Sequence, residues 1–170
     1  AEESFYFDVS GGTDGYRRFT VDANKPISDT VAVRLNFLAH ENRVADRDVV
    51  KSNRWAFAPA ISFSIGTDTR FTAIFLHQQE GRIPDYGVPV AVTAALTDIE
   101  VPVTELGVPR SSFYGFADGD ADDVNVDTLT LKFEHDSSEN LKFTSDTKLG
   151  SYKRFFRQSI PACPAACSAA

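Results

Sequence analysis

The strongest constraint on the fold is an alternation of apolar and polar residues with a period of two in two successive stretches, 31–40 and 55–65. In the first stretch, Val33 and Phe37 fall on one parity and Arg34 falls on the other. A period of two is typical of a β-strand with one apolar and one polar face. Each run is about 11 residues long, close to the roughly 9–11 residues with which a tilted strand crosses a bilayer, whereas soluble strands peak near 5–6. We therefore expect two paired strands of membrane-spanning length.

Further segments with the same alternation are predicted as strands, which brings the total to about seven. They are 4–10, 16–25, 69–79, 124–135 and 140–156. Pro26 is expected to end its strand because proline has no N–H to donate to a neighbouring strand. The predicted fold class is all-β: an antiparallel up-and-down meander of about seven long strands, with residues 1–170 forming one segment of a partial transmembrane β-barrel.

The connections between the predicted strands alternate in length. Short connections alternate with long ones, the short being 27–30, 66–68 and 136–139 and the long being 41–54 and 80–121. Bacterial outer-membrane barrels have short periplasmic turns and long extracellular loops. A connection as long as 80–121 within a compact domain is also uncommon and usually functional. The sequence therefore predicts a sheet with short turns at one rim and long loops at the other, as in an outer-membrane barrel.

Composition and motifs exclude several classes of function. The net charge of -7, the pI near 4.9 and the lack of a strong basic cluster argue against a nucleic-acid partner. No apolar run approaches the roughly 18 residues of a transmembrane helix. No Ser/His/Asp set accompanies a recognisable nucleophile turn, and no glycine-rich phosphate loop follows a strand. We therefore predict that the chain is not an enzyme, and we assign no catalytic residue and no cofactor.

Two groups of residues raise the question of a metal site. The acidic run 118–123 lacks the Gly at the sixth position and the Glu at the twelfth that a calcium loop requires, so a solvated acidic loop is expected. His40, His77 and His135 are far apart in the sequence and have no second ligand at metal-binding spacing. We expect polar residues of the lumen or rim at these positions and predict no metal site.

The two cysteines, Cys163 and Cys167, lie in a Pro/Ala-rich tail. A CxxxC pair is too sparse for a structural zinc site, which takes four ligands. A local disulfide in an oxidising compartment is favoured over two free thiols, and both interpretations stay open. The sequence contains no Met, even at position 1, so we expect a processed chain or a piece of a longer one.

Several motifs, taken in order, carry a resemblance to a known family. They are Gly11-Gly12-Thr13-Asp14-Gly15-Tyr16-Arg17-Arg18, Asp22-x-Asn24-x-Pro26, Arg34-Leu35-Asn36, Arg47-Asp48-x-Val50, Ala58-Pro59-x-Ile61-x-Phe63, Thr67-Asp68-Thr69-Arg70, Asp85-Tyr86-Gly87-Val88-Pro89, Phe113-Tyr114-Gly115-Phe116 and Leu131-Lys132-Phe133-Glu134-His135-Asp136. In this order and spacing they resemble the TonB-dependent siderophore receptors of Gram-negative outer membranes, most closely the branch that takes up ferric catecholate siderophores.

The resemblance implies an outer-membrane barrel of about 22 strands around a plug. With about seven strands, no plug and no energy-coupling box, the chain is expected to be the N-terminal part of such a barrel. The implied function is TonB-dependent uptake of ferric siderophores. The implied partners are a ferric siderophore, outer-membrane lipid and, in the full-length receptor only, TonB and the plug. Because open sheet edges are forbidden in lipid, the isolated chain is not expected to transport anything.

The long connection contains candidates for siderophore binding. Arg82, Tyr86, Phe113 and Tyr114 combine a guanidinium group with aromatic rings, which attract an aromatic, anionic ferric chelate. A cluster of loop residues that pack only on one another is the alternative. Because a ferric siderophore holds its iron through its own organic ligands, no bond between protein and iron is expected.

A second set of candidates lies on the strands. Arg18, Asp22, Arg34 and Asn36 share the polar parity of adjacent predicted strands. We predict that they line the lumen and contact a plug through charge-assisted hydrogen bonds. The alternative is that they only solvate the water-facing side of the sheet.

A different class of function remains as the second hypothesis, a soluble β-barrel or sandwich that binds a ligand. Such a domain would bury the Phe-rich parity in a core rather than in lipid. The strand number and net charge suit it, but the strand lengths and the loop asymmetry do not. A soluble domain stays monomeric without detergent, whereas a barrel segment exposes a large apolar band and aggregates.

Overall fold

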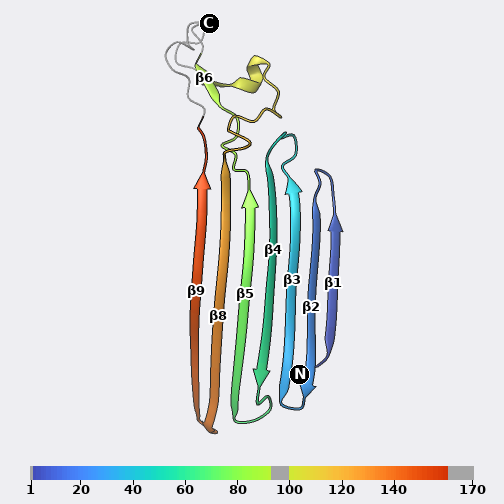
Figure 1. Cartoon of the computed structure of the whole chain (residues 1–170), viewed down its shortest axis with the longest axis vertical. Helices are drawn as coiled ribbons and strands as arrows, with labels where there is room; N and C mark the ends of the chain where they lie inside the picture. The colour runs from blue at the N-terminus through green and yellow to red at the C-terminus, as the bar shows by residue number, and fades with distance from the viewer. Residues whose placement is uncertain (1, 93–99, 161–170) are drawn as a thin grey trace.

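The computed structural model describes residues 2–92 and 100–160, and its main element is one seven-stranded antiparallel sheet (Figure 1). Its strands are β1 (Ser4–Gly11), β2 (Arg17–Ser28), β3 (Val31–Arg43), β4 (Lys51–Phe63), β5 (Thr69–Arg82), β8 (Ala121–Ser138) and β9 (Leu141–Arg157). Their order in the sheet is their order in the chain. The predicted all-β meander of seven strands is therefore confirmed.

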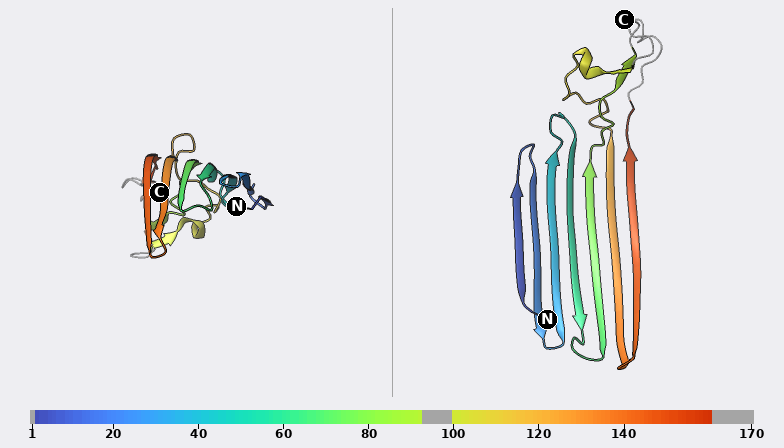
Figure 2. Two further views of the ribbon diagram at one scale, coloured as in Figure 1. Left: turned by 90° about the horizontal axis from the view of Figure 1, so that it is seen from below. Right: turned by 180° about the vertical axis from the view of Figure 1, so that it is seen from behind.

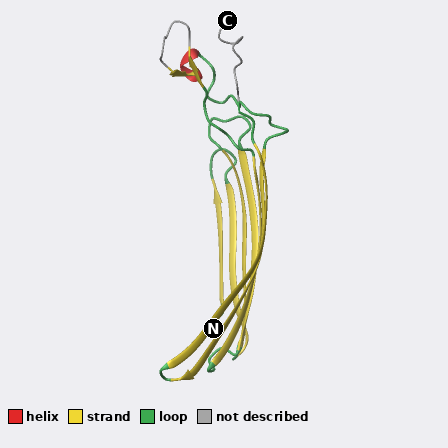
Figure 3. Cartoon of the chain, turned by 90° about the vertical axis from the view of Figure 1, so that its left-hand side faces the viewer, coloured by secondary structure: helices red, strands yellow, loops and turns green. Residues whose placement is uncertain are grey.

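Most strands of the sheet are long. β2 to β5 contain 12 to 14 residues, and β8 and β9 contain 18 and 17. Figure 3 shows that the strands bend together along their length instead of forming a flat sheet, as the right-handed twist of β-strands requires. Only β1, with 8 residues, is as short as many strands of soluble proteins.

The two ends of the sheet differ, as Figures 1 and 2 show. One end carries tight turns. The opposite end, here called the long-loop rim, carries the connections 44–50 and 83–120. The longer connection contains a small hairpin of β6 (Val90–Val92) and β7 (Glu100–Pro102), followed by the 3-10 helix η1 (Val103–Leu106). No described helix is long and apolar enough to span a membrane.

Several boundaries differ from the prediction; β8, for example, was expected at 124–135 and extends over Ala121–Ser138. The connection expected at 41–54 is shorter, because β3 and β4 continue to pair up to Arg43 and Lys51. Pro26 does not end its strand: it lies opposite Ala32, and β2 continues to Ser28 across a register irregularity. Proline is tolerated at this position because it lies next to the irregularity, where the regular hydrogen bonding between the strands is already interrupted.

The register divides the sheet into two chemically distinct faces. Directly paired residues share a face, so the alignment of Phe7, Val21, Phe37 and Phe57 across β1 to β4 defines an apolar face. The residues of the other parity define the polar face.

The sheet buries very little apolar surface within the chain. Among the described residues, only Ala32 and Val50 are buried hydrophobic residues, while Phe7 remains 66% and Phe63 40% exposed. The soluble-domain hypothesis required the Phe-rich parity to form a core, and the described part of the chain contains no such core. An exposed apolar face of this extent requires an apolar environment outside the chain.

Candidate functional site

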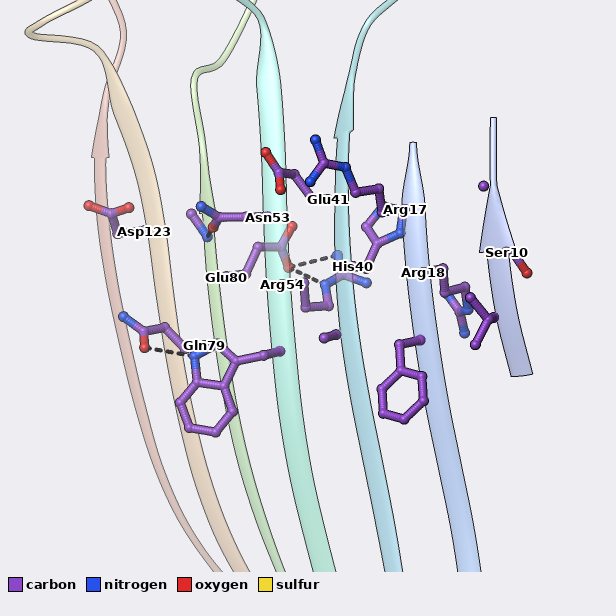
Figure 4. A pocket seen from close by; sticks show the side chains of 16 residues that line it. Ser10, Arg17, Arg18, His40, Glu41, Asn53, Arg54, Gln79, Glu80 and Asp123 are labelled. Atoms are coloured by element: carbon purple, nitrogen blue, oxygen red, sulfur yellow. Dashed lines mark hydrogen bonds and ion pairs between the residues drawn. The ribbon is translucent and has the colours of Figure 1, made fainter. Parts of the chain in front are cut away.

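The polar face carries a row of charged residues close to the long-loop rim. The register aligns Arg18, His40, Arg54 and Glu80 across β2 to β5, and Figure 4 shows these side chains close to one another. Arg54 and Glu80 form an ion pair, with 2.7 Å between Nη2 and Oε2. The pairing continues this row across β8 to Arg154.

Asp122 joins three strands at this level. It lies opposite Arg82 of β5, and both Arg82 and Arg154 of β9 pair with its carboxylate. The Nε atom of Arg154 lies 2.7 Å from Oδ1 of Asp122. The Asp122 side chain is 1% exposed, whereas those of Arg82 and Arg154 are 45% and 56% exposed. The carboxylate is therefore buried beneath guanidinium groups that remain open to solvent.

This row and the residues one step closer to the loops are together called the cationic row, because they carry more positive than negative charges. The row, with its neighbours one step closer to the loops, has four cationic and two acidic side chains, which are Arg18, Arg54, Arg82 and Arg154 against Glu80 and Asp122. No ion pair involves Arg18 within residues 2–92 and 100–160. Because the anions are buried and the cations are accessible, the row presents net positive charge and favours anionic ligands.

A second cluster of contacts holds the two long connections together. Arg47 is 4% exposed at its side chain and donates hydrogen bonds to the backbone oxygen of Arg110 (2.7 Å) and to Oδ1 of Asp85 (2.8 Å). Its guanidinium lies over the ring of Tyr114, with 5.9 Å between Cζ and the ring centroid. The connection 44–50 is thus anchored to the connection 83–120 through one buried cation.

Three of the four predicted siderophore-binding residues line one cavity. Tyr86, Phe113 and Tyr114 lie around a space of about 280 Å³ within the long connection. The hydroxyl of Tyr114 is buried and has no hydrogen-bond partner among the described residues, whereas Tyr86 is 59% exposed. Arg82 does not line this cavity, because its side chain pairs with Asp122 on the polar face.

Asp120 closes the base of the same cavity. It is 4% exposed and accepts hydrogen bonds from the backbone N–H and the hydroxyl of Ser159 (3.0 and 2.8 Å) and from the N–H of Phe116 (3.0 Å). Burial by itself raises the pKa of Asp120, but these hydrogen bonds and the nearby Arg157 outweigh it, so the pKa is lowered.

The acidic run at 118–123 is therefore not uniformly solvated. Asp118 and Asp123 are exposed, as expected, but Asp120 and Asp122 are buried and fully engaged by hydrogen-bond donors. The expectation of a solvated acidic loop is wrong for these two residues, because their partners come from β5, β9 and the segment after β9. Within residues 2–92 and 100–160, no group of three or more potential metal ligands converges.

The four residues predicted to line the lumen all lie on the polar face. Arg34 donates from Nε (2.8 Å) and Nη2 (2.5 Å) to the two carboxylate oxygens of Asp22 on the neighbouring strand. Asn36 lies directly opposite Asp22, and Arg18 lies opposite His40 nearer the rim. Asp22, Arg34 and Asn36 thus form a cross-strand polar group.

The remaining candidates from the sequence are dispersed. His40 lies on the polar face, while His77 and His135 lie at two levels of the opposite face, where they contact Asp127 and Thr69. Both predicted cysteine positions, 163 and 167, lie outside the described residues.

Comparison with known proteins relates this geometry to a class of receptor. No family model matches the chain. The catecholate siderophore receptor Fiu of Escherichia coli K12 is 35% identical over 150 residues, which are 86% of this chain and 20% of the receptor. The crystal structure of this ferric-catecholate import receptor, in its closed form, superposes with a TM-score of 0.81 at 32% identity over 92% of this chain and 22% of that one. The chain is homologous to the siderophore receptors.

The probable TonB-dependent receptor BfrD of Bordetella pertussis extends this relationship, with 32% identity over 155 residues, 90% of this chain and 20% of the receptor. The chain thus spans about a fifth of the length of these relatives. Its meander corresponds to part of the Fiu barrel, so the predicted resemblance and the predicted partial barrel are both confirmed. These relatives are outer-membrane receptors and not enzymes.

Sequence reasoning missed several residues near the long-loop rim. Arg54 and Arg154 lie a hundred positions apart in the sequence and share a row only through the pairing of β4, β5, β8 and β9. Arg47 belongs to a motif that carried the resemblance, but nothing in its local sequence identified Asp85 as its partner. The parity of the strands could have indicated that Arg18 and Arg54 share a face, but not their level along the sheet.

Proposed function

We propose that this chain forms the N-terminal part of the barrel of an outer-membrane receptor for TonB-dependent uptake of ferric siderophores, with residues 1–170 as one segment of that barrel. The observation that carries this proposal is the close superposition on the ferric-catecholate import receptor at 32% identity. TonB and a plug act on the full-length receptor, and the segment supplies part of the wall.

The proposed ligand is a ferric catecholate, which carries net negative charge and aromatic rings. The cationic row supports an anionic ligand, because its guanidinium groups are half exposed and outnumber the carboxylates. The cavity lined by Tyr86, Phe113 and Tyr114 supports an aromatic one. We propose that these aromatic residues capture the ligand, and that Arg82 acts with the cationic row as the ligand moves into the lumen.

A second proposed role of the polar face is contact with the plug. Arg18, Asp22, Arg34 and Asn36 face one side of the sheet at successive levels. Arg34 and Asp22 already satisfy each other, so their pair offers a preorganised surface. Arg18 has no ion-pair partner in the described residues and is free to donate charge-assisted hydrogen bonds to a plug or a passing anion.

A pair of adjacent residues tests this function. Arg17 and Arg18 occupy opposite faces of β2 because successive residues of a strand alternate. In the complete receptor that carries this segment, Arg18→Gln is expected to weaken binding of a ferric catecholate about fivefold, the equivalent of about 1 kcal/mol. Arg17→Gln, which removes the same charge from the other face, is the matched control and is expected to leave this affinity unchanged.

Fluorescence titration with a ferric catecholate and with an uncharged ferric hydroxamate measures both affinities. The proposal predicts binding of the catecholate, a loss in Arg18→Gln and no comparable loss for the hydroxamate. Failure of the unsubstituted receptor to bind any ferric siderophore would contradict the proposed function. Equal effects of the two substitutions on catecholate binding would show that the cationic row does not contribute to binding.

A further inference from the structure

The apolar face has an open hollow of about 860 Å³ next to the long-loop rim. Two successive rows of residues on this face line it, and so do the residues that lie between these rows along the strands, which are Ser10, Arg18, His40, Arg54 and Glu80 (Figure 4). The row farther from the rim is mainly apolar and contains Val9, Phe19, Ala39 and Trp55. The row nearer the rim is polar and contains Arg17, Glu41, Asn53 and Asp123. The hollow, here called the rim groove, therefore has an apolar lower wall and a charged upper wall.

Gly81 keeps the upper part of the rim groove open. A Cβ atom at this position would lie 3.0 Å from Oδ1 of Asn53 and 3.2 Å from Oδ1 of Asp123, closer than side chains normally approach. The backbone N–H of Gly81 donates a hydrogen bond to Oδ1 of Asn53 (3.1 Å). A side chain at position 81 would therefore occupy the space between the polar walls.

The side chains around the rim groove change from apolar to charged towards the long-loop rim. Trp55 is 39% exposed, and its Nε1 donates to Oε1 of Gln79 over 3.1 Å. Below it on the same face lie Phe57 and the other large apolar residues, and above it lie charged residues. Tryptophan with its polar edge satisfied is typical of the membrane interface. Because long loops of such barrels are extracellular, this interface belongs to the outer leaflet.

The charges at this level favour an anionic group. Cations outnumber carboxylates on the apolar-face parity near the rim, with Arg17, Arg43, Lys51 and Lys153 against Glu41 and Asp123. Within the described residues, no ion pair joins any of these four cations to a carboxylate. They are therefore available to a phosphate group outside the chain.

We propose that the rim groove binds a phosphate-bearing lipid of the outer leaflet. Its acyl chains pack against Phe19 and Trp55, and its phosphate lies at Arg17, with Gly81 providing room for the headgroup. The inference rests on the proposed function, because only a barrel segment of an outer-membrane receptor turns this face towards lipid. The residues proposed to contact the lipid lie on the face opposite the cationic row, although Arg18, Arg54 and Glu80 of that row also border the rim groove.

Native mass spectrometry of the complete receptor, purified in mild detergent and stripped of lipid, tests this inference. The probes are phosphatidylglycerol, a phosphate-free galactosyl diacylglycerol with the same acyl chains, and inorganic phosphate alone. Of the three probes, phosphatidylglycerol is expected to form the adducts that survive to the highest collision energy. Arg17→Gln is expected to reduce them about fivefold, since one arginine near a membrane surface contributes about 1 kcal/mol. Lys148→Gln, which removes a positive charge from the other face outside the rim groove, is expected to retain them.

Gly81→Val provides a second variant that fills the groove without changing charge, and it is also expected to lose the adduct. Ferric-siderophore binding by each variant reports correct folding and, in the unsubstituted receptor, tests the proposed function separately. Equal lipid retention by Arg17→Gln, Gly81→Val and Lys148→Gln would overturn the inference. Equal retention of the galactolipid, or binding of inorganic phosphate without lipid, would overturn it as well.

Discussion

The two faces of the sheet are built from the same strands but are stabilised in different ways. On the polar face, side chains satisfy one another, as in the pair Arg34–Asp22 and in the bridge from Asp122 to Arg82 and Arg154. On the apolar face, most Phe side chains remain more than a third exposed. The polar face can satisfy its groups within the chain, whereas the apolar face depends on its surroundings.

This difference shows what a period of two encodes in such a chain. In a soluble sandwich the apolar parity is buried and becomes the main source of stability. In the proposed barrel it is the outer surface, so the hydrophobic contribution to stability comes from lipid contact and is absent in water. Substitutions that exchange the character of the two faces therefore test the comparison directly.

The largest effect is expected for a charge placed on the apolar face. Leu131→Arg, in the middle of β8, is expected to lower the free energy of unfolding in lipid vesicles by about 2–4 kcal/mol, the typical value for Arg near the bilayer midplane. Thr130→Arg, one residue away on the polar face, is the control and is expected to cost much less. Urea titration of the full receptor in vesicles measures both values; similar losses would mean that the two faces do not meet different solvents.

A smaller effect is expected from breaking the buried bridge on the polar face. Asp122→Asn removes the charge that holds Arg82 and Arg154, and it is expected to destabilise the receptor by about 1–3 kcal/mol. The lower part of that range applies because both guanidinium groups are half exposed and partly rehydrate. Asp146→Asn, at an exposed ion pair with Lys132, is the control. The same urea titration distinguishes them, and an equally small loss for both would show that Asp122 is not structurally important.

The smallest effect concerns the pH dependence of the long-loop rim. Folding lowers the pKa of the Asp120 carboxyl. The charged carboxylate therefore contributes fully to stability above the pKa that Asp120 has in the unfolded chain, and this contribution is lost as the pH falls through its pKa in the folded chain. Acidification is therefore expected to release the contact with Ser159. NMR of the Ser159 amide across the acidic range measures this release. Asp120→Asn is expected to abolish the pH dependence and Asp118→Asn to retain it.

The sheet could be predicted from the sequence to a large extent because it depends on local signals. Alternation of residues set the strands, and Gly and Asp residues marked several turns, including Gly66 with its positive φ. The extension of β2 beyond Pro26 could not be predicted, because it depends on the pairing with β3. The hairpin within 83–120 was not predicted either, since its two strands have only three residues each.

The candidate site could be predicted only in part. Tyr86, Phe113 and Tyr114 were recognised from their motifs, and the structure brings them to one cavity. The cationic row and the buried position of Asp122 depend on register between distant strands, which residue types alone do not determine. The rim groove is formed by residues of six strands, β1 to β5 and β8, so no single segment of the sequence reveals it.

The most direct test of the account is the depth of Trp55, the single tryptophan of the chain, in a bilayer. Its fluorescence is measured in the complete receptor, with every other tryptophan replaced by phenylalanine, after reconstitution in vesicles of lipids brominated at successive positions along the acyl chain. The account predicts strong quenching that is greatest for bromines nearest the headgroup, because Trp55 lies on the apolar face at the interface. Absence of quenching by any brominated lipid, together with a cooperatively folded monomer in detergent-free buffer, would contradict the assignment of the apolar face to lipid.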